Sequence, residues 1–140
     1  MEIQIGHNKI NLGNSIIYFK VGGEILGMGG PWNGDLYQDD FLISADVLLD
    51  VMAYDADNGI IYFAKFNKFK TWFSSNYFFT VNFFVLTTKK VYQYKHEFRR
   101  LFLGKLLSDN VLEIYDSFHD GFPEKKSLFN LNEEAYVLKT

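Results

Sequence analysis

The chain has 140 residues, with 17 acidic and 14 basic side chains, a net charge of −3 and a pI near 5.5, which argues against a dedicated nucleic-acid binder. It has no cysteine, which excludes disulfide bonds and thiolate zinc sites, and its length predicts a single β domain over residues 1–140. Hydrophobic residues make up 48 % and aromatic residues 19 %, so a packed core is expected and disorder is not.

The start of the chain has no targeting pattern. The first residues lack the basic start and apolar run of a signal peptide. No apolar run approaches the ~18 residues that a membrane-spanning helix needs. We therefore expect a cytoplasmic protein that does not associate with membranes.

Two strands are expected near the N-terminus, at residues 2–5 and 15–21. The intervening residues 11–14 are rich in Asn and Gly and predict a turn. Apolar side chains occupy both faces of the second strand, which is typical of a strand inside a sandwich.

Residues 22–34 hold six of the chain's 11 glycines. Gly22 and Gly27 have the spacing of the outer glycines of a phosphate-binding P-loop, but Met28 stands where that loop needs lysine. Pro31 prevents the glycine run from opening a helix, as a dinucleotide-binding fingerprint requires. The segment therefore predicts a bent strand followed by a wide turn.

Polar residues then mark two possible display sites for binding. A turn is predicted at 31–35, where the Trp32 side chain either packs over a loop or is exposed for binding to a partner. The acidic pair Asp39 and Asp40 falls on the next turn or strand end.

Residues 44–54 alternate as a strand does, but their apolar residues also show helical spacing. We favour the strand, because the turn sequence Asp-Ala-Asp-Asn-Gly at 55–59 follows it. The apolar run at 60–64 completes a strong hairpin signal.

The clearest pattern lies in the middle of the chain. Apolar side chains occupy alternate positions, which predicts two strands, 77–87 and 91–98, joined by a turn at 88–90. Thr80 and Asn82 interrupt the second face of the first strand. One face of this hairpin is therefore expected to be dry and the other partly polar.

A further pair of strands is predicted at 99–107 and 110–118, followed by a stop signal at 120–123. A last strand is expected at 127–131, and a short helix, capped by its first residue, at 132–138. Together these elements predict a mainly β fold. We expect an antiparallel β-sandwich or partly open barrel of about seven to ten strands, with at most one or two short helices.

No residue pattern indicates catalysis. His7, His96 and His119 lack a second ligand at a metal-binding spacing, and no serine lies in a G-x-S-x-G elbow. Asp55 and Asp57 match the start of a calcium loop, but its later ligand positions hold residues without a side-chain oxygen. We predict a protein that is not an enzyme and binds no metal or cofactor; the alternative is a weak hydrolase that uses His119.

Charge is distributed unevenly along the chain. Residues 1–64 hold two basic and nine acidic side chains. Residues 65–105 hold nine basic side chains and one acidic side chain, and residues 106–140 hold three basic and seven acidic side chains. Either oppositely charged strands pair within the fold, or folding leaves one acidic and one basic face, one of which meets a charged partner. The basic and aromatic run at 65–73 suits nucleic acid, but lysines also protect the edges of aromatic strands. Nucleic acid is therefore the less favoured partner.

The aromatic-rich, mildly acidic chain, with Gly-Pro-Trp-Asn-Gly at 30–34 and the hairpin sequence at 55–64, resembles the small bacterial immunity proteins of contact-dependent and polymorphic toxin systems. The resemblance implies a cytoplasmic protein that neutralises a cognate toxin, often a nuclease, by covering its active site with an acidic patch. Alternatives are a small-molecule binding barrel with a closed aromatic cavity, or a nucleic-acid binding domain. Because turns beside a rigid sheet usually display binding residues, we expect the partner to contact a set of acidic turn residues and one tryptophan: Trp32, Asp35, Asp39, Asp40, Asp55 and Asp57. The oligomeric state is left open.

Overall fold

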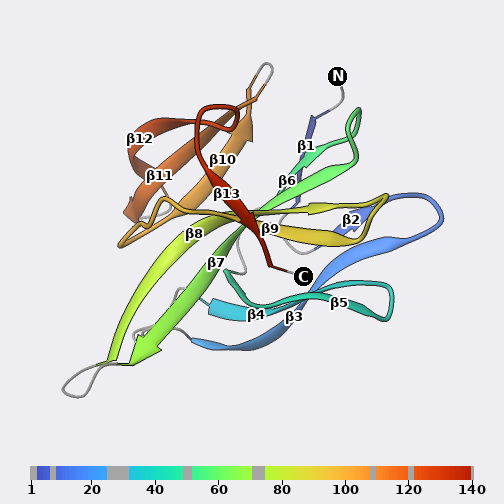
Figure 1. Ribbon diagram of the computed structural model, residues 1–140, viewed down its shortest axis with the longest axis horizontal. Helices are drawn as coiled ribbons and strands as arrows, with labels where there is room; N and C mark the ends of the chain where they lie inside the picture. The colour runs from blue at the N-terminus through green and yellow to red at the C-terminus, as the bar shows by residue number, and fades with distance from the viewer. Residues whose placement is uncertain are drawn as a thin grey trace.

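The computed structural model describes residues 3–6, 9–24, 32–48, 52–70, 75–107, 110–119 and 122–139, and within them the chain forms thirteen strands and no helix (Figure 1). The strands are β1 (Ile3–Gly6), β2 (Lys9–Asn11), β3 (Ile16–Glu24), β4 (Trp32–Gln38), β5 (Phe41–Leu48), β6 (Met52–Asp55), β7 (Ile60–Lys70), β8 (Ser75–Val85), β9 (Lys90–Tyr94), β10 (Phe102–Leu106), β11 (Val111–His119), β12 (Phe122–Asn130) and β13 (Tyr136–Leu138). The predicted mainly β fold is confirmed.

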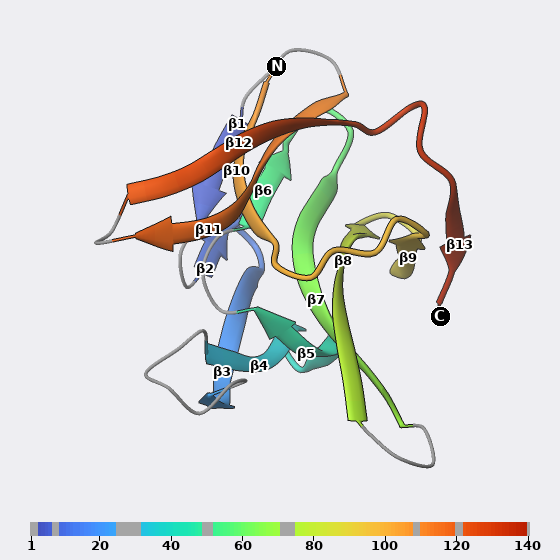
Figure 2. The same ribbon diagram turned by 90° about the vertical axis from the view of Figure 1, so that its left-hand side faces the viewer.

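The strands form two antiparallel sheets. The larger sheet has the order β13-β9-β8-β7-β5-β4-β3-β2, and β6 joins β7 to β1. The smaller sheet has the order β10-β11-β12. In Figure 1 the smaller sheet lies on one side of β7, β8 and β9, and β3, β4 and β5 lie on the other. Figure 2 shows the same two layers after a quarter turn.

The central hairpin explains why there are two layers. β7 and β8 pair from Ile60↔Val85 to Lys70↔Ser75, and successive side chains point to opposite faces. One face carries Tyr62, Val81 and Phe83 into an inter-sheet core against the smaller sheet. The other carries Ile61, Phe63 and Phe84 into a second core, which the larger sheet encloses by curling over it. The fold therefore combines a sandwich with a half-barrel.

The predicted hairpins at 55–64 and 77–98 are confirmed, with β9 ending earlier than expected. The strand predicted for 44–54 is confirmed in its described parts, β5 and β6, while residues 49–51 lie outside the described residues. The bent strand is also confirmed, because the β3–β4 register shifts between Val21 and Gly23. Its wide turn lies outside the described residues.

Three local predictions are wrong. The turn predicted at 31–35 is strand from Trp32 onward, because β4 pairs with both β3 and β5. The stop predicted at 120–123 is correct in that β11 ends at His119, but wrong in extent, because β12 begins at Phe122. The strand 15–21 is not enclosed on both faces: Ile17 is fully buried, but Ile16 is 39 % exposed, because β3 lies one strand from the sheet edge.

The helix predicted at 132–138 is also wrong. The segment forms a turn and then β13, which pairs with β9 from Tyr136↔Tyr94 to Leu138↔Tyr92. The Tyr136 ring packs against Phe83 and Tyr92, so tertiary contacts outweigh the local helical signal. The backbone N–H of Asn132 donates to the side chain of Asn130, so Asn132 does not cap a helix.

Candidate functional site

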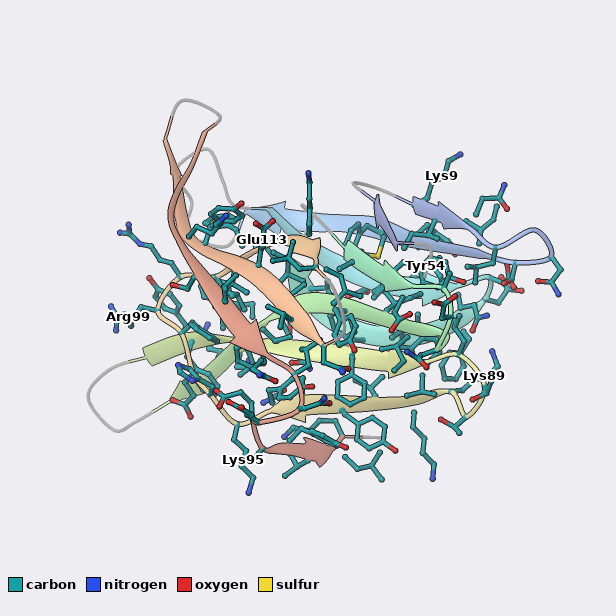
Figure 3. The ribbon with its side chains drawn as sticks, turned by 90° about the horizontal axis from the view of Figure 1, so that it is seen from above. Lys9, Tyr54, Lys89, Lys95, Arg99 and Glu113 are labelled. Atoms are coloured by element: carbon teal, nitrogen blue, oxygen red, sulfur yellow. The ribbon has the colours of Figure 1, made fainter. Side chains whose placement is uncertain are left out.

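The up-and-down order of the larger sheet brings four hairpin turns to one end of the molecule. These turns join β2 to β3, β4 to β5, β6 to β7 and β8 to β9, and all four lie at the right of Figure 1. Lys9, Tyr54 and Lys89, on three of these hairpins, lie on the same side in Figure 3. We call this region the turn end.

The β4–β5 turn is the best-anchored part of the turn end. Asp39 has a left-handed backbone (φ 51°), and its carboxylate accepts a hydrogen bond from the backbone N–H of Ile16 at 3.1 Å. The Tyr18 hydroxyl donates to the carbonyl of Asp39 at 2.8 Å. These bonds fix the turn against β3, while Asp39 and Asp40 remain exposed.

The β8–β9 turn packs against the β4–β5 turn and closes the half-barrel at this end. Lys89 Nζ donates to Gln38 Oε1 at 2.8 Å and lies 5.2 Å from the centre of the Phe41 ring. Phe41 also stacks on Phe84 of β8 with ring centres 6.1 Å apart. Phe41 and Leu42 are nevertheless 40 % and 47 % exposed, so the turn end presents apolar surface beside acidic side chains.

The structure separates the six predicted partner-binding residues. Asp39, Asp40 and Asp57 are exposed at the turn end. Asp55 is only 5 % exposed and accepts hydrogen bonds from the backbone and the side chain of Asn58, so it organises the β6–β7 turn. The remaining two residues, Asp35 and Trp32, lie on β4.

Trp32 lies far from the acidic turns. It begins β4, whereas Asp39 follows the end of that strand. A strand rises about 3.3 Å per residue, so a separation of seven residues corresponds to roughly 20 Å. Asp35 is partly buried opposite Lys20 of β3. Trp32 and the acidic turns therefore do not belong to one surface patch.

A groove of about 420 Å³ opens on the curled face of the larger sheet. β5 pairs with β7 at Val47↔Lys65, and residues 42–45, before this pair, line the groove opposite Lys65 and Asn67 of β7. One wall is the β5 segment 42–45. The floor and other wall come from three neighbouring strands and the C-terminal segment: Lys65, Asn67, Asn82, Val91, Gln93 and Lys139.

A chain of hydrogen bonds crosses the floor of this groove. Asn67 Nδ2 donates to Thr80 Oγ1 at 3.0 Å, and the Thr80 hydroxyl donates to Asn82 Oδ1 at 2.7 Å. Asn82 Nδ2 then donates to Gln93 Oε1 at 3.3 Å. Thr80 and Asn82 are buried, and such polar groups are costly in a core unless they pair with one another.

Lys65 is one of the two cations that line the groove. Its ammonium group donates to the carbonyl of Ala45 and, at 3.3 Å, to the Ser44 hydroxyl. Burial lowers the pKa of Lys65, and the positive charge of Lys139 acts in the same direction. Asp46 and Asp35 oppose this shift. The hydrogen bonds of Lys65 to Ser44 and Ala45 connect β7 to β5 across the groove.

Comparison with protein-family models, with curated proteins and with solved structures found no match. The function must therefore be argued from the sequence and from the geometry of these two surfaces.

His96 is the one histidine whose side chain the structure describes. His96 is exposed, stacks on Phe98 with ring centres 4.3 Å apart, and its Nδ1 lies 3.1 Å from Glu134 Oε1. The side chains of His119 and Asp116 lie outside the described residues. No group of three or more potential metal ligands occurs in the part of the chain that the structure describes.

The basic residues do not line one continuous surface. On β7, Lys65 lines the groove, whereas Lys68, three residues later, is exposed and does not line it. Arg99 lies over the Tyr77 ring, and Figure 3 places Arg99 and Lys89 at opposite ends of the molecule. No helix in the described ranges is both long enough and apolar enough to cross a membrane.

The groove was not predicted from the sequence, although the sequence contains a signal for it. Thr80 and Asn82 were the two polar interruptions of the central strand. Polar side chains on the buried face of a central strand indicate either a hydrogen-bonded network or a site. Their partners on β7 and β9 depend on strand order, which the sequence does not specify.

Proposed function

We propose that this protein is a non-catalytic protein-binding domain and that the turn end is its contact surface. The residues of that surface are three acidic and three apolar side chains: Asp39, Asp40, Asp57, Ile16, Phe41 and Leu42. This proposal keeps three of the five acidic residues expected from the sequence and leaves out Asp35, Asp55 and Trp32.

The observation that supports the proposal most directly is the combination of exposed apolar and acidic side chains on anchored turns. Ile16, Phe41 and Leu42 are 39–47 % exposed; Asp39 is hydrogen-bonded to the backbone of Ile16, and Asp39 and Asp40 directly precede Phe41 and Leu42 in the chain. Protein interfaces typically have an apolar centre with a charged rim. A turn that is already fixed loses little conformational entropy when it binds.

A partner with a cationic surface fits the acidic side chains, and the toxin active site of a nuclease is such a surface. On this basis we propose that the protein is an immunity protein that neutralises a cognate bacterial toxin in the cytoplasm. Lys89 of the adjacent turn and Lys90 at the start of β9 give the surface a mixed charge pattern. Mixed charges set the orientation of a complex as well as its rate of association.

The test is co-expression with a toxin encoded by the adjacent gene, together with calorimetric titration of the purified pair. Wild type is expected to restore growth and bind the toxin. The double variant Ile16→Lys, Asp40→Lys is expected to weaken binding at least about tenfold, because it removes apolar and acidic contacts together. Its binding is also expected to depend less on salt concentration than that of wild type.

The matched control is Glu133→Lys, a charge reversal at an exposed residue in the turn before β13. We expect it to bind like wild type. If the double variant retains wild-type affinity and protection, the turn end is not the contact surface. If wild type neither binds nor protects against the adjacent toxin, the immunity function is wrong.

A further inference from the structure

We propose that the groove between β5 and the β7–β9 strands is a binding site for a small organic carboxylate. The acid group would contact Lys65, Gln93 and Lys139, and the apolar part would lie along Ile43 and Val91. This site is independent of the proposed protein contact surface, with which it shares only Leu42 at its border.

The hydrogen bonds of the floor fix the orientation of each amide. Asn67 Nδ2 donates to the backbone carbonyl of Lys65 at 3.2 Å, which identifies the nitrogen because a carbonyl cannot donate. Asn67 therefore donates to Thr80 as well, and Thr80 has one hydroxyl hydrogen left to give. It gives this hydrogen to the side-chain oxygen of Asn82.

The direction of these bonds determines what the groove offers a ligand. Because the oxygen of Asn82 accepts from Thr80, its nitrogen must donate to the oxygen of Gln93. The oxygen of Gln93 is thus occupied, and its NH₂ group remains as a donor on a residue that lines the groove. The chain of side chains therefore ends in a donor that is accessible from the groove and is available to an acceptor on a ligand.

The charges of the groove favour an anion as that acceptor. Lys65 and Lys139 line the groove, and none of its described lining residues is acidic. The carboxylates of Asp35 and Asp46 act on Lys65 from outside the lining. Two cations and an amide donor match the two oxygens of a carboxylate, which accepts several hydrogen bonds at once.

The remaining walls favour an organic acid over a bare inorganic anion. Leu42, Ile43, Ala45 and Val91 provide apolar surface beside the donors. A volume of about 420 Å³ lies within the range of small-molecule sites. The described lining contains no aromatic side chain, so this is not the closed aromatic cavity considered from the sequence.

The experiment is an NMR titration of the full-length protein with hexanoate, and in parallel with hexanamide, which has the same chain but no charge. Hexanoate is expected to shift the amide signals of residues 42–45, Asn82 and Gln93 with a Kd on the order of 0.1–1 mM. Hexanamide is expected to bind at least about fivefold more weakly, because it lacks the charge that the lysines recognise. Equal affinity for the two probes would overturn the proposal, as would the absence of saturable shifts with hexanoate.

Variants connect the binding to the named side chains. Lys65→Met and Lys139→Met are each expected to raise the Kd for hexanoate at least about fivefold. Lys68→Met, on the same strand but outside the groove lining, is the control and should leave the Kd unchanged. Lys139 is exposed, so its variant is expected to fold even if Lys65→Met does not. Unchanged affinity in Lys139→Met would contradict the assigned position of the acid group.

Discussion

At the residue scale, the two aspartates of the β6–β7 turn illustrate how one residue type serves two purposes. Asp55 is 5 % exposed and its carboxylate accepts hydrogen bonds from Asn58, at 3.3 Å from the backbone nitrogen and 2.7 Å from Nδ2. Asp57, two residues later, is exposed. Gly59 completes the turn with a φ of 63°, a conformation that glycine adopts without strain. The sequence predicted this turn correctly but gave both aspartates the same role.

We predict that Asp55→Ala lowers the free energy of unfolding by about 1–3 kcal/mol, because the turn loses the two hydrogen bonds that the buried Asp55 carboxylate accepts from Asn58. Asp57→Ala, the matched control, is expected to change it by less than about 0.5 kcal/mol. Urea denaturation followed by circular dichroism measures both. Equal losses in the two variants would show that Asp55 does not organise the turn.

At the element scale, the smaller sheet depends on a local irregularity in β10. The β10–β11 register shifts between Leu103 and Leu106, and within this bulge the backbone N–H of Lys105 donates to Glu113 Oε1 at 3.2 Å. Glu113 is 8 % exposed and also pairs with Lys126 of β12 at 3.1 Å. One carboxylate therefore links all three strands of the smaller sheet.

Gly104 lies in this bulge because there is no room for a side chain. A Cβ atom at this position would lie 2.7 Å from Cε2 of Tyr115 and 3.0 Å from Cβ of Glu113. We predict that Gly104→Ala lowers the free energy of unfolding by about 1–3 kcal/mol. The double variant with Tyr115→Ala should lose less than the sum of the two single variants, since the ring is then absent. Strict additivity in urea denaturation would show that the clash does not determine the choice of glycine.

The sequence predicted elements well where alternation was long and poorly where pairing was decided by distant strands. The β6–β7 and β8–β9 hairpins followed from period-two patterns and turn residues. β13 was predicted as a helix because its neighbour, β9, lies more than forty residues earlier in the chain. The β4 strand was mistaken for a turn for a different reason: Pro, Asn and Gly give a local turn signal, which pairing with the neighbouring strands β3 and β5 overrides.

At the scale of the whole molecule, the two cores share the same two strands. Tyr62 and Ala64 of β7 face the inter-sheet core, while Ile61 and Phe63 face the core inside the curled sheet. If β7 or β8 unfolds, both cores therefore lose side chains at the same time. The sequence indicated a sandwich or a partly open barrel as alternatives, and the shared hairpin is the reason that both descriptions apply. For the same reason, the turn end and the groove became visible only when strand order was known.

This arrangement predicts that the chain unfolds as one cooperative unit although it has two sheets. Leu112 of β11 is fully buried in the inter-sheet core, so Leu112→Ala should lower the free energy of unfolding by about 2–5 kcal/mol. Leu128→Ala, the same substitution at a residue of β12 that is 63 % exposed, should cost less than about 1 kcal/mol. Calorimetry of both variants is expected to show a single transition whose van't Hoff and calorimetric enthalpies agree.

Amide hydrogen exchange distinguishes this cooperative behaviour from independent unfolding of the smaller sheet. If the two cores unfold together, Leu112→Ala reduces the protection of Phe63 and Phe84, in the other core, by the same free energy as that of Ile114. If the smaller sheet unfolds alone, Ile114 loses protection while Phe63 and Phe84 keep theirs, and calorimetry shows two transitions. That second pattern would mean that β7 and β8 hold the curled sheet together without help from the smaller sheet, and the chain would then be two cooperative units.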